Sequence, residues 1–210
     1  MQLDDWSNII IRMDHSTSYQ DTRERILCTG EALILGRGFS AVGLNEILSQ
    51  AAVPKGSFYH YFQSKEGFGV ALLVRYFDVY ETRLAALFQD QTRSARERLL
   101  AYFDGWHQLH AASDCQRACL AVKLAAEVSD LSEPMREALH TGMARIVAQL
   151  TGAVRACQAD GSLSADTNAE QLAQSLYAMW IGASLLAKVD RSLLPIELAF
   201  RQTEQMLQAI

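Results

Sequence analysis

Two short helical segments follow one another almost without a linker between Leu44 and Phe62, and this arrangement constrains the fold more than any other feature. The first segment, 44–52, must end before Pro54, because proline lacks a backbone N–H and clashes with the preceding helical turn. Its fixed φ suits the first turn of a new helix, so we expect a second helix over 54–62. The two helices are therefore expected to meet at a tight turn.

The rest of the chain is also predicted to be helical, so we expect an all-α fold. Half of the 210 residues are hydrophobic and only three are Pro, and Ala, Leu, Glu and Gln prevail between the glycine breaks. The first helix is expected to end at Gly38 in a Schellman motif, with Phe39 folding back on its last turn. The expected helices cover 21–38, 44–52, 54–62, 64–88, 94–112, 115–129, 133–158, 167–189 and 195–209.

Three parts are expected along the chain: a flexible tail over 1–19, a helix-turn-helix domain over 20–65 and a larger domain over 66–210. Met13 opens a polar segment that would make a natural start, so 1–12 could be an upstream extension. No stretch approaches the ~18 uncharged apolar residues of a membrane span, and the N-terminus has no signal-peptide pattern. We therefore expect a soluble, cytoplasmic protein without membrane contact.

Helical spacing divides the side chains of the segment 54–62 into two faces. Phe58 and Phe62 fall on one side, where Tyr61 is also expected to join the core, while Lys55, Tyr59 and His60 lie nearer the other. The first set can pack on a supporting helix while the second reaches the major groove. This is what a DNA-binding helix-turn-helix requires.

Charge gives no support for nucleic-acid binding. The net charge is −5, and residues 1–66 hold six Lys and Arg against eight Asp and Glu. A basic surface is the usual electrostatic sign of a DNA-binding domain. The hypothesis of DNA binding therefore rests on the motif.

The order of residues around this motif resembles the N-terminal signature of TetR-family repressors. The resemblance spans about 21–75 and rests on Gly38, Phe39, Ile47, the run Ala51 to Phe62 and the triplet Ser64-Lys65-Glu66. It implies a homodimeric repressor that binds a palindromic operator in double-stranded DNA through residues 44–62. It also implies a long connecting helix, followed by a C-terminal helical domain for ligand sensing and dimerisation.

The resemblance further implies which residues contact DNA. Helix N-termini and Lys bind phosphate, Gly lets the backbone approach, and Tyr and His can contact bases. Two usual Ser or Thr positions are occupied by Val42-Gly43-Leu44 and Pro54, which implies fewer phosphate contacts. The alternative is that the aromatic residues only form the core of a three-helix bundle. The implied DNA-contacting residues are Lys55, Gly56, Ser57, Tyr59 and His60, with Lys65 on a phosphate and Thr22 and the Leu44 amide as weaker candidates.

The four cysteines have no metal-type spacing, so each thiol is free for chemistry or packing. On the expected helix, Lys123 lies one turn beyond Cys119, where its charge could favour the thiolate. Cys115 lies one turn before Cys119, although two residues on one helix rarely have good disulfide geometry. Cys28 and Cys157 are expected to pack as small hydrophobic residues.

The stretches around Cys119 and from Tyr177 to Lys188 resemble a narrower group in the family, the repressors of N-ethylmaleimide reductase. This resemblance implies a sensor of reactive electrophiles and oxidants, with Cys119 as the sensing thiol and Lys188 as its nearby amine. A thiolate can be alkylated, or oxidised to a sulfenic acid that a nitrogen traps reversibly. From the residues alone, a core cysteine and a helix-end lysine are the ordinary alternative.

Two other hypotheses remain open. One is a repressor that binds a small apolar ligand without a covalent bond, although an aromatic stripe is more often core. The other is a cysteine-dependent detoxifying enzyme, but the sequence shows no paired general base, phosphate loop or metal-ligand cluster. We therefore expect no enzyme, cofactor or metal. The candidate pocket residues are Phe103, Trp106, His107, Met143, Tyr177 and Trp180.

The helix over 167–189 is apolar nearly all round near its centre, so it must be buried on more than one side. The small residues Gly182, Ala183, Ser184 and Ala187 permit close helix approach. With the 133–158 helix, it could form a four-helix bundle with the same pair of a second subunit, as in the family. The alternative is that both helices bury their faces within one monomer.

Overall fold

The computed structural model describes residues 22–113 and 119–208, and it confirms the all-α prediction. In these two ranges the chain forms nine helices and no strand. No helix there is long and apolar enough to cross a membrane. The helices are α2 (Thr22–Arg37), α3 (Leu44–Ala51), α4 (Lys55–Phe62), α5 (Lys65–Phe88), α6 (Ala95–Ala112), α7 (Leu120–Val128), α8 (Glu133–Ala159), α9 (Ala169–Asp190) and α10 (Leu194–Met206).

Every predicted helix is present, and the start of α7 differs most from its predicted position. The prediction placed that start at residue 115, whereas the structure begins the helix at Leu120 with Cys119 as its N-cap. The predicted tail over 1–19 and the predicted role of Cys115 lie outside the described residues. Local capping chemistry explains why the starts of α6 and α9 could be predicted from the sequence.

Short-range hydrogen bonds begin several of these helices. At α6, the Ser94 hydroxyl accepts the backbone N–H of Glu97, and the Glu97 carboxylate accepts the backbone N–H of Ser94 at 2.7 Å. This reciprocal pair is a capping box. At α9, the Asn168 side chain accepts the Gln171 N–H at 2.9 Å. Each bond satisfies a donor that the first helical turn would leave unpaired.

The described residues form two compact units, which are considered separately. The helix-turn-helix unit comprises 22–78 and 119–143, and the second unit comprises 79–113 and 144–208. Helices α5 and α8 each contribute to both units. The helix-turn-helix unit is therefore larger than the domain predicted over 20–65, because α7 and the first parts of α5 and α8 belong to it as well.

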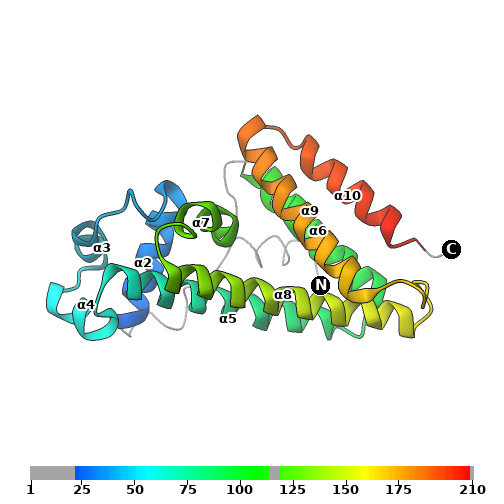
Figure 1. The fold of residues 1–210 in the computed structure, drawn as a ribbon, viewed down its shortest axis with the longest axis horizontal. Helices are drawn as coiled ribbons and strands as arrows, with labels where there is room; N and C mark the ends of the chain where they lie inside the picture. Colours follow the sequence, from blue (N-terminus) through cyan, green and yellow to red (C-terminus); the bar gives the residue numbers. More distant parts are fainter. Residues whose placement is uncertain (1–21, 114–118, 209–210) are drawn as a thin grey trace. The chain divides into compact units, whose positions relative to one another are not determined.

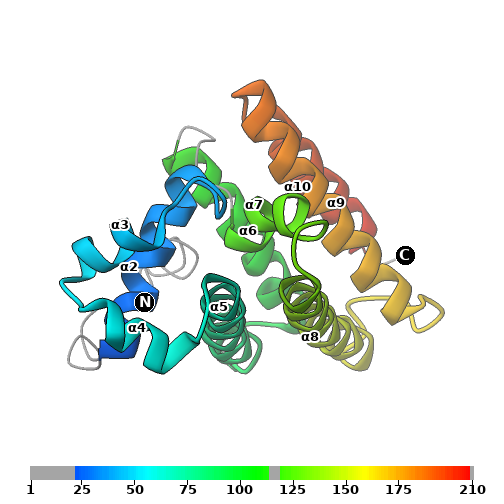
Figure 2. The same ribbon diagram turned by 60° about the vertical axis from the view of Figure 1, so that its left-hand side comes forward.

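In the helix-turn-helix unit, α2, α3 and α4 lie together beside the start of α5 (Figures 1 and 2). Phe58 and Phe68 are fully buried at their meeting point, with ring centroids 5.7 Å apart. Gly30 lets α2 approach α5, because an added Cβ there would lie 2.3 Å from the Phe68 ring. The other fully buried apolar residues of the three short helices are Ile26, Leu27, Ile34 and Ile47.

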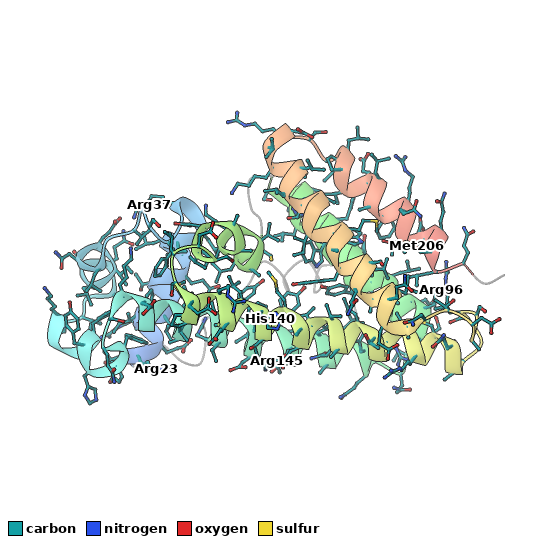
Figure 3. All side chains as sticks on the ribbon, in the orientation of Figure 1. Arg23, Arg37, Arg96, His140, Arg145 and Met206 are labelled. Carbon is teal, nitrogen blue, oxygen red and sulfur yellow. The ribbon has the colours of Figure 1, made fainter. Side chains whose placement is uncertain are left out.

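In the second unit, α6, α9 and α10 lie side by side (Figures 1 and 2). Trp180 of α9 is fully buried, stacks on Phe103 of α6 at 5.1 Å, and donates its indole N–H to the Thr203 hydroxyl of α10 at 2.9 Å. Arg145 of α8, labelled in Figure 3, forms an ion pair with Glu81 of α5. The aromatic core thus joins α6, α9 and α10, and the ion pair joins α5 to α8.

Two buried polar residues of the second unit, His110 and Ser184, pair with each other. The His110 ring lies between the Trp106 carbonyl at 2.8 Å and the Ser184 hydroxyl at 2.9 Å. Burial lowers the pKa of His110, so the ring is neutral and bonds through one N–H and one unprotonated nitrogen. Ser184 and Ala187, expected to permit close helix approach, are buried inside this unit.

Gly142 provides a test of packing between α5 and α8. Substitution Gly142→Ala would place a Cβ 2.0 Å from the ring of Phe77, which is only 2% exposed. Overpacking costs about 1–3 kcal/mol, more than the ~1 kcal/mol that alanine gains over glycine in a helix. We expect Gly142→Ala to lower the free energy of unfolding, measured by urea denaturation.

Gly152→Ala is the matched control on the same helix. Gly152 is exposed and an added Cβ would contact nothing within 4 Å. Helix propensity should then stabilise the protein by up to about 1 kcal/mol. Equal gains in stability from both substitutions would contradict the close contact at Gly142.

Candidate DNA interface and thiol site

The turn between α3 and α4 is compact and leaves both helix N-termini without side-chain caps. Ala52 adopts a left-handed conformation with φ 51°, and its N–H bonds back to α3. Pro54 is the N-cap of α4 rather than part of its first turn, because its ψ of 147° is extended rather than helical. Neither Gly43 nor Pro54 offers a side-chain hydrogen bond to its helix. The first-turn N–H groups without a partner can therefore donate hydrogen bonds to an anionic phosphate.

Helix α4 has one buried face and one exposed face. Phe58 is fully buried and Phe62 is 5% exposed, and their rings lie 5.1 Å apart. Tyr59 and His60 are exposed, as their helical spacing predicts. The prediction that Tyr61 belongs to the core is wrong, since its side chain is 38% exposed. With Phe58 and Phe62 filling the buried side, no room for it remains on that face.

The exposed face begins with Lys55 and Gly56. The Lys55 ammonium lies 5.9 Å from the centre of the Tyr59 ring, so two predicted DNA contacts are neighbours. An added Cβ at Gly56 would meet nothing within 4 Å of the protein. The fold itself thus places no steric demand for glycine there, which fits a close approach to an external backbone. Ser57 lies beside them and is partly exposed, and Leu44 and Thr22 are the partly exposed first residues of α3 and α2.

Lys65 has a structural partner that the sequence did not indicate. Its ammonium donates to the Phe39 carbonyl at 2.8 Å and lies 4.7 Å from the centre of the Phe39 ring. Burial lowers the pKa of Lys65, and the charge of Glu127 raises it in part. Lys65 therefore braces the turn after α2. Its contact with a DNA phosphate stays a prediction.

The end of α2 is not the predicted Schellman motif. Gly38 has a φ of +96° and donates its N–H to the Ile34 carbonyl at 2.8 Å, which is the simpler left-handed ending. The next two amides bond elsewhere. Phe39 N–H donates to Glu127 Oε2 at 2.9 Å, and Ser40 N–H donates to Glu127 Oε1 at 2.6 Å. The carboxylate of α7 takes the amide that a Schellman motif would have used.

Arg75 of α5 joins the connecting helix to α2. It pairs with Glu24 and lies 2.9 Å from Glu31, and its Nη2 donates to the Cys28 sulfur at 3.1 Å. Burial raises the pKa of Cys28 to about 11, and the charge of Arg75 offsets only part of that rise. Cys28 is buried as expected, but it packs within an ionic cluster rather than among apolar groups alone. Its thiol is fully protonated near neutral pH.

Cys119 is the N-cap of α7 and is 8% exposed. Its sulfur accepts the Val122 N–H at 3.4 Å. Burial raises the pKa of the Cys119 thiol, while hydrogen bonds from Val122, from Tyr76 of α5 and from Ala121 lower it in part. The thiol is therefore neutral at rest, in contrast to the expectation that a neighbouring cation favours the thiolate. The charge of Lys123 lowers the pKa of Glu127, one turn further along α7.

The remaining predicted residues belong mainly to the second unit. Lys188 lies in the last turn of α9 and is partly buried. Of the six candidate pocket residues, Met143 lies in the helix-turn-helix unit and the other five in the second unit. Trp106 packs edge to face on Trp180 at 6.1 Å, and His107 contacts Phe200. These aromatic contacts are those of a packed core, the alternative that the sequence left open.

Comparison with known proteins decides the family. The family model described as bacterial regulatory proteins of the tetR family matches residues 26–77, and the tetracyclin repressor-like C-terminal domain matches 95–203. The chain belongs to the TetR family. The first match contains α3, α4 and their supporting contacts, and the second contains Cys119 and Lys188. This TetR-family chain is a transcriptional repressor with an N-terminal helix-turn-helix and a C-terminal helical domain.

Relatives of this repressor are also regulators. The HTH-type transcriptional repressor NemR of Escherichia coli is 45% identical over 89% of this chain and 94% of its own length. The crystal structure of its reduced form has a TM-score of 0.81 and covers 90% of this chain and 98% of that one. The transcriptional regulator AcuR of Cereibacter sphaeroides is 36% identical over 73% of this chain and 70% of its own length.

The exposed face of α4 can be tested by removing two side chains. We expect Lys55→Ala together with Tyr59→Ala to abolish a gel shift with operator DNA, because a phosphate contact and a groove contact are lost. Both residues are exposed, so helicity by circular dichroism should be unchanged. A retained shift at wild-type affinity would rule out this face as the DNA interface.

Proposed function

We propose that this TetR-family repressor leaves its operator when a reactive electrophile or an oxidant modifies Cys119. The observation that carries the proposal is the position of Cys119 as a buried N-cap whose sulfur accepts a helix N–H. An added group has no room in such a site and changes the acceptor that begins α7. The 45% sequence identity to NemR, whose reduced form has been crystallised, agrees with a redox-active thiol.

The chemistry with a maleimide is an addition. The Cys119 thiolate attacks one carbon of the activated C=C bond, and an S–C bond forms as the π bond breaks. The neighbouring carbon then takes up a proton from solvent. The hydrogen bonds from Val122 N–H and the Tyr76 hydroxyl stabilise the thiolate once the proton has left. The resting thiol is protected because burial disfavours its charged form.

The oxidant response uses the same sulfur. Hypochlorite oxidises the thiol by two electrons to a sulfenic acid and is itself reduced to chloride. An amine can then displace the hydroxyl group, which forms an S–N bond and releases water. Lys188, in the last turn of α9, stays the predicted source of that amine. Thiol reductants would reverse the bond and restore repression.

This proposal makes the protein a regulator that acts on DNA in the bacterial cytoplasm, without catalytic turnover. Its relatives are transcriptional regulators. A single modification per subunit is enough to change operator occupancy. The proposal therefore requires a covalent adduct, in contrast to an inducer that binds reversibly among the aromatic residues of the second unit.

Replacement of Cys119 by Ser tests the sensor. We expect N-ethylmaleimide to release the wild-type protein from its operator and to leave Cys119→Ser bound, because serine is not alkylated. The measurement is a gel shift or fluorescence anisotropy before and after treatment, with mass spectrometry of the adduct. Release of Cys119→Ser to the same extent as wild type would overturn the proposal.

Cys157→Ser is the matched control, because Cys157 is also buried and burial also raises its pKa. Its response to N-ethylmaleimide should equal that of wild type. The rate of Cys119 alkylation is a second readout. Since the Cys119 pKa lies above its usual value of 9.0, the rate should rise about tenfold per pH unit from pH 7 to 9 without levelling off.

We also propose a homodimer formed through α9 and α10. Five large apolar side chains on these two helices are at least half exposed in the single chain, and Val189 is 71% exposed. None of the large exposed apolar side chains of the described residues lies on α8, so the predicted pairing of α8 with α9 receives less support. A two-fold dimer reads a palindromic operator. The five residues are Leu185, Leu186, Val189, Leu194 and Leu198.

The dimer proposal is tested by placing charge on this surface. We expect Leu186→Glu with Val189→Glu to give a monomer in analytical ultracentrifugation, because buried, unpaired carboxylates oppose association. Operator affinity should fall with it. Leu131→Glu is the control, since Leu131 is 67% exposed but belongs to the helix-turn-helix unit. A dimer that survived the double substitution would place the interface elsewhere.

A further inference from the structure

The carboxylate of Glu127 holds the turn that leads into the helix-turn-helix. It accepts the N–H groups of Phe39 and Ser40, at 2.9 and 2.6 Å, across 88 and 87 positions of sequence. Both donors lie between the end of α2 and the start of α3 at Leu44. A single side chain of α7 thus fixes two consecutive peptide groups in the DNA-binding segment.

The charge state of Glu127 suits this task. Burial alone would raise its pKa, but the hydrogen bonds from the Ser40 and Phe39 amides, the Ser40 hydroxyl and the charge of Lys123 bring the pKa below its usual value. The carboxylate is therefore ionised near neutral pH. Hydrogen bonds to an ionised acceptor are shorter and stronger than neutral ones.

The turn is held from two sides. While Glu127 accepts its amides, the Lys65 ammonium donates to the Phe39 carbonyl at 2.8 Å. Gly38 allows α7 to approach, because an added Cβ would lie 2.9 Å from Glu127 Oε2 and the φ of +96° also disfavours a side chain. An exposed ion pair between Arg37, which is labelled in Figure 3, and Glu46 also spans the turn. Such an exposed pair contributes little by itself.

Helix α7 joins this contact to the thiol site within the helix-turn-helix unit. Cys119 begins the helix and Glu127 lies in its last turn, one residue before its end at Val128. A helix this short has no independent stability in water, so loss of its N-cap changes the position or the length of the whole element. Glu127 would then leave the Phe39 and Ser40 amides.

We propose that Glu127 is a positioning residue for DNA binding: its carboxylate holds the 38–40 turn so that α3 and α4 can enter the operator, and displacement of α7 releases that turn. The trigger at Cys119 rests on the function proposed above. The positioning role itself does not, because it acts in the unmodified protein.

The first test is Glu127→Gln, which preserves size but removes the charge and one of the two acceptor oxygens. We expect operator binding by the unmodified homodimer to weaken about tenfold or more, measured by fluorescence anisotropy. Glu133→Gln is the control, since Glu133 is 62% exposed and pairs with Arg136 on its own helix. Wild-type affinity in Glu127→Gln would overturn the proposal.

The second test separates positioning from general stability through a double cycle. Operator affinity is measured for wild type and Glu127→Gln, each before and after alkylation with N-ethylmaleimide. If alkylation acts by withdrawing Glu127, it should cost much less affinity in Glu127→Gln than in wild type. Equal fold-losses in the two proteins would show independent effects and overturn the link to α7.

Ser40→Ala keeps the test valid if Glu127→Gln folds poorly. Ser40 is exposed, and its hydroxyl is one of the donors to Glu127. We expect a two- to threefold loss of affinity with an unchanged melting temperature, and no loss would count against the proposal. If alkylation fails to release wild type, the sensor function fails, whereas the affinity of unmodified Glu127→Gln still decides the positioning role.

Discussion

The packing of Phe58 and Phe62 against Phe68 is the interaction on which the DNA-binding surface depends. Helix α4 spans Lys55–Phe62, and a helix this short is marginal in water without tertiary packing. Burying an aromatic side chain contributes about 1.5–3 kcal/mol, so two phenylalanines on one face can hold it. The other residues of α4 are not needed in the core, and their side chains lie on its exposed face.

The same unit places chemistry and support on one short helix. At the start of α7, burial keeps the Cys119 thiol neutral. Hydrogen bonds from backbone N–H groups and from the Tyr76 hydroxyl would stabilise the thiolate. Near its end, amide donors keep Glu127 ionised. Both groups depend on the position of a single helix. Under the proposed function, a modification of Cys119 that displaces this helix would therefore release the turn before α3.

Electrostatics within the helix-turn-helix unit is local rather than global. The chain has a net charge of −5, but two of its cations bind specific groups. Arg75 of α5 forms ion pairs with Glu24 and Glu31 of α2, and Lys65 donates to the Phe39 carbonyl. Such pairs at short range outweigh the small repulsion of a modest net charge in salt solution. The absence of a basic composition therefore says little about the α4 surface, where motif geometry exposes the residues predicted to contact DNA.

The sequence by itself determined the helices, most of their ends and the two faces of α4, because capping, proline breaks and helical spacing act over one or two turns. The sequence also indicated the TetR family and singled out Cys119 as the candidate sensor thiol. Only the tertiary structure decided that Tyr61 is exposed, that Cys119 caps α7, and that Glu127 and Lys65 hold the 38–40 turn. Glu127 lies 88 positions from Phe39, and any of the 24 acidic residues could have met those amides. Which one does is set by how helices pack in space, since a carboxylate bonds to whatever donor the fold brings within about 3 Å.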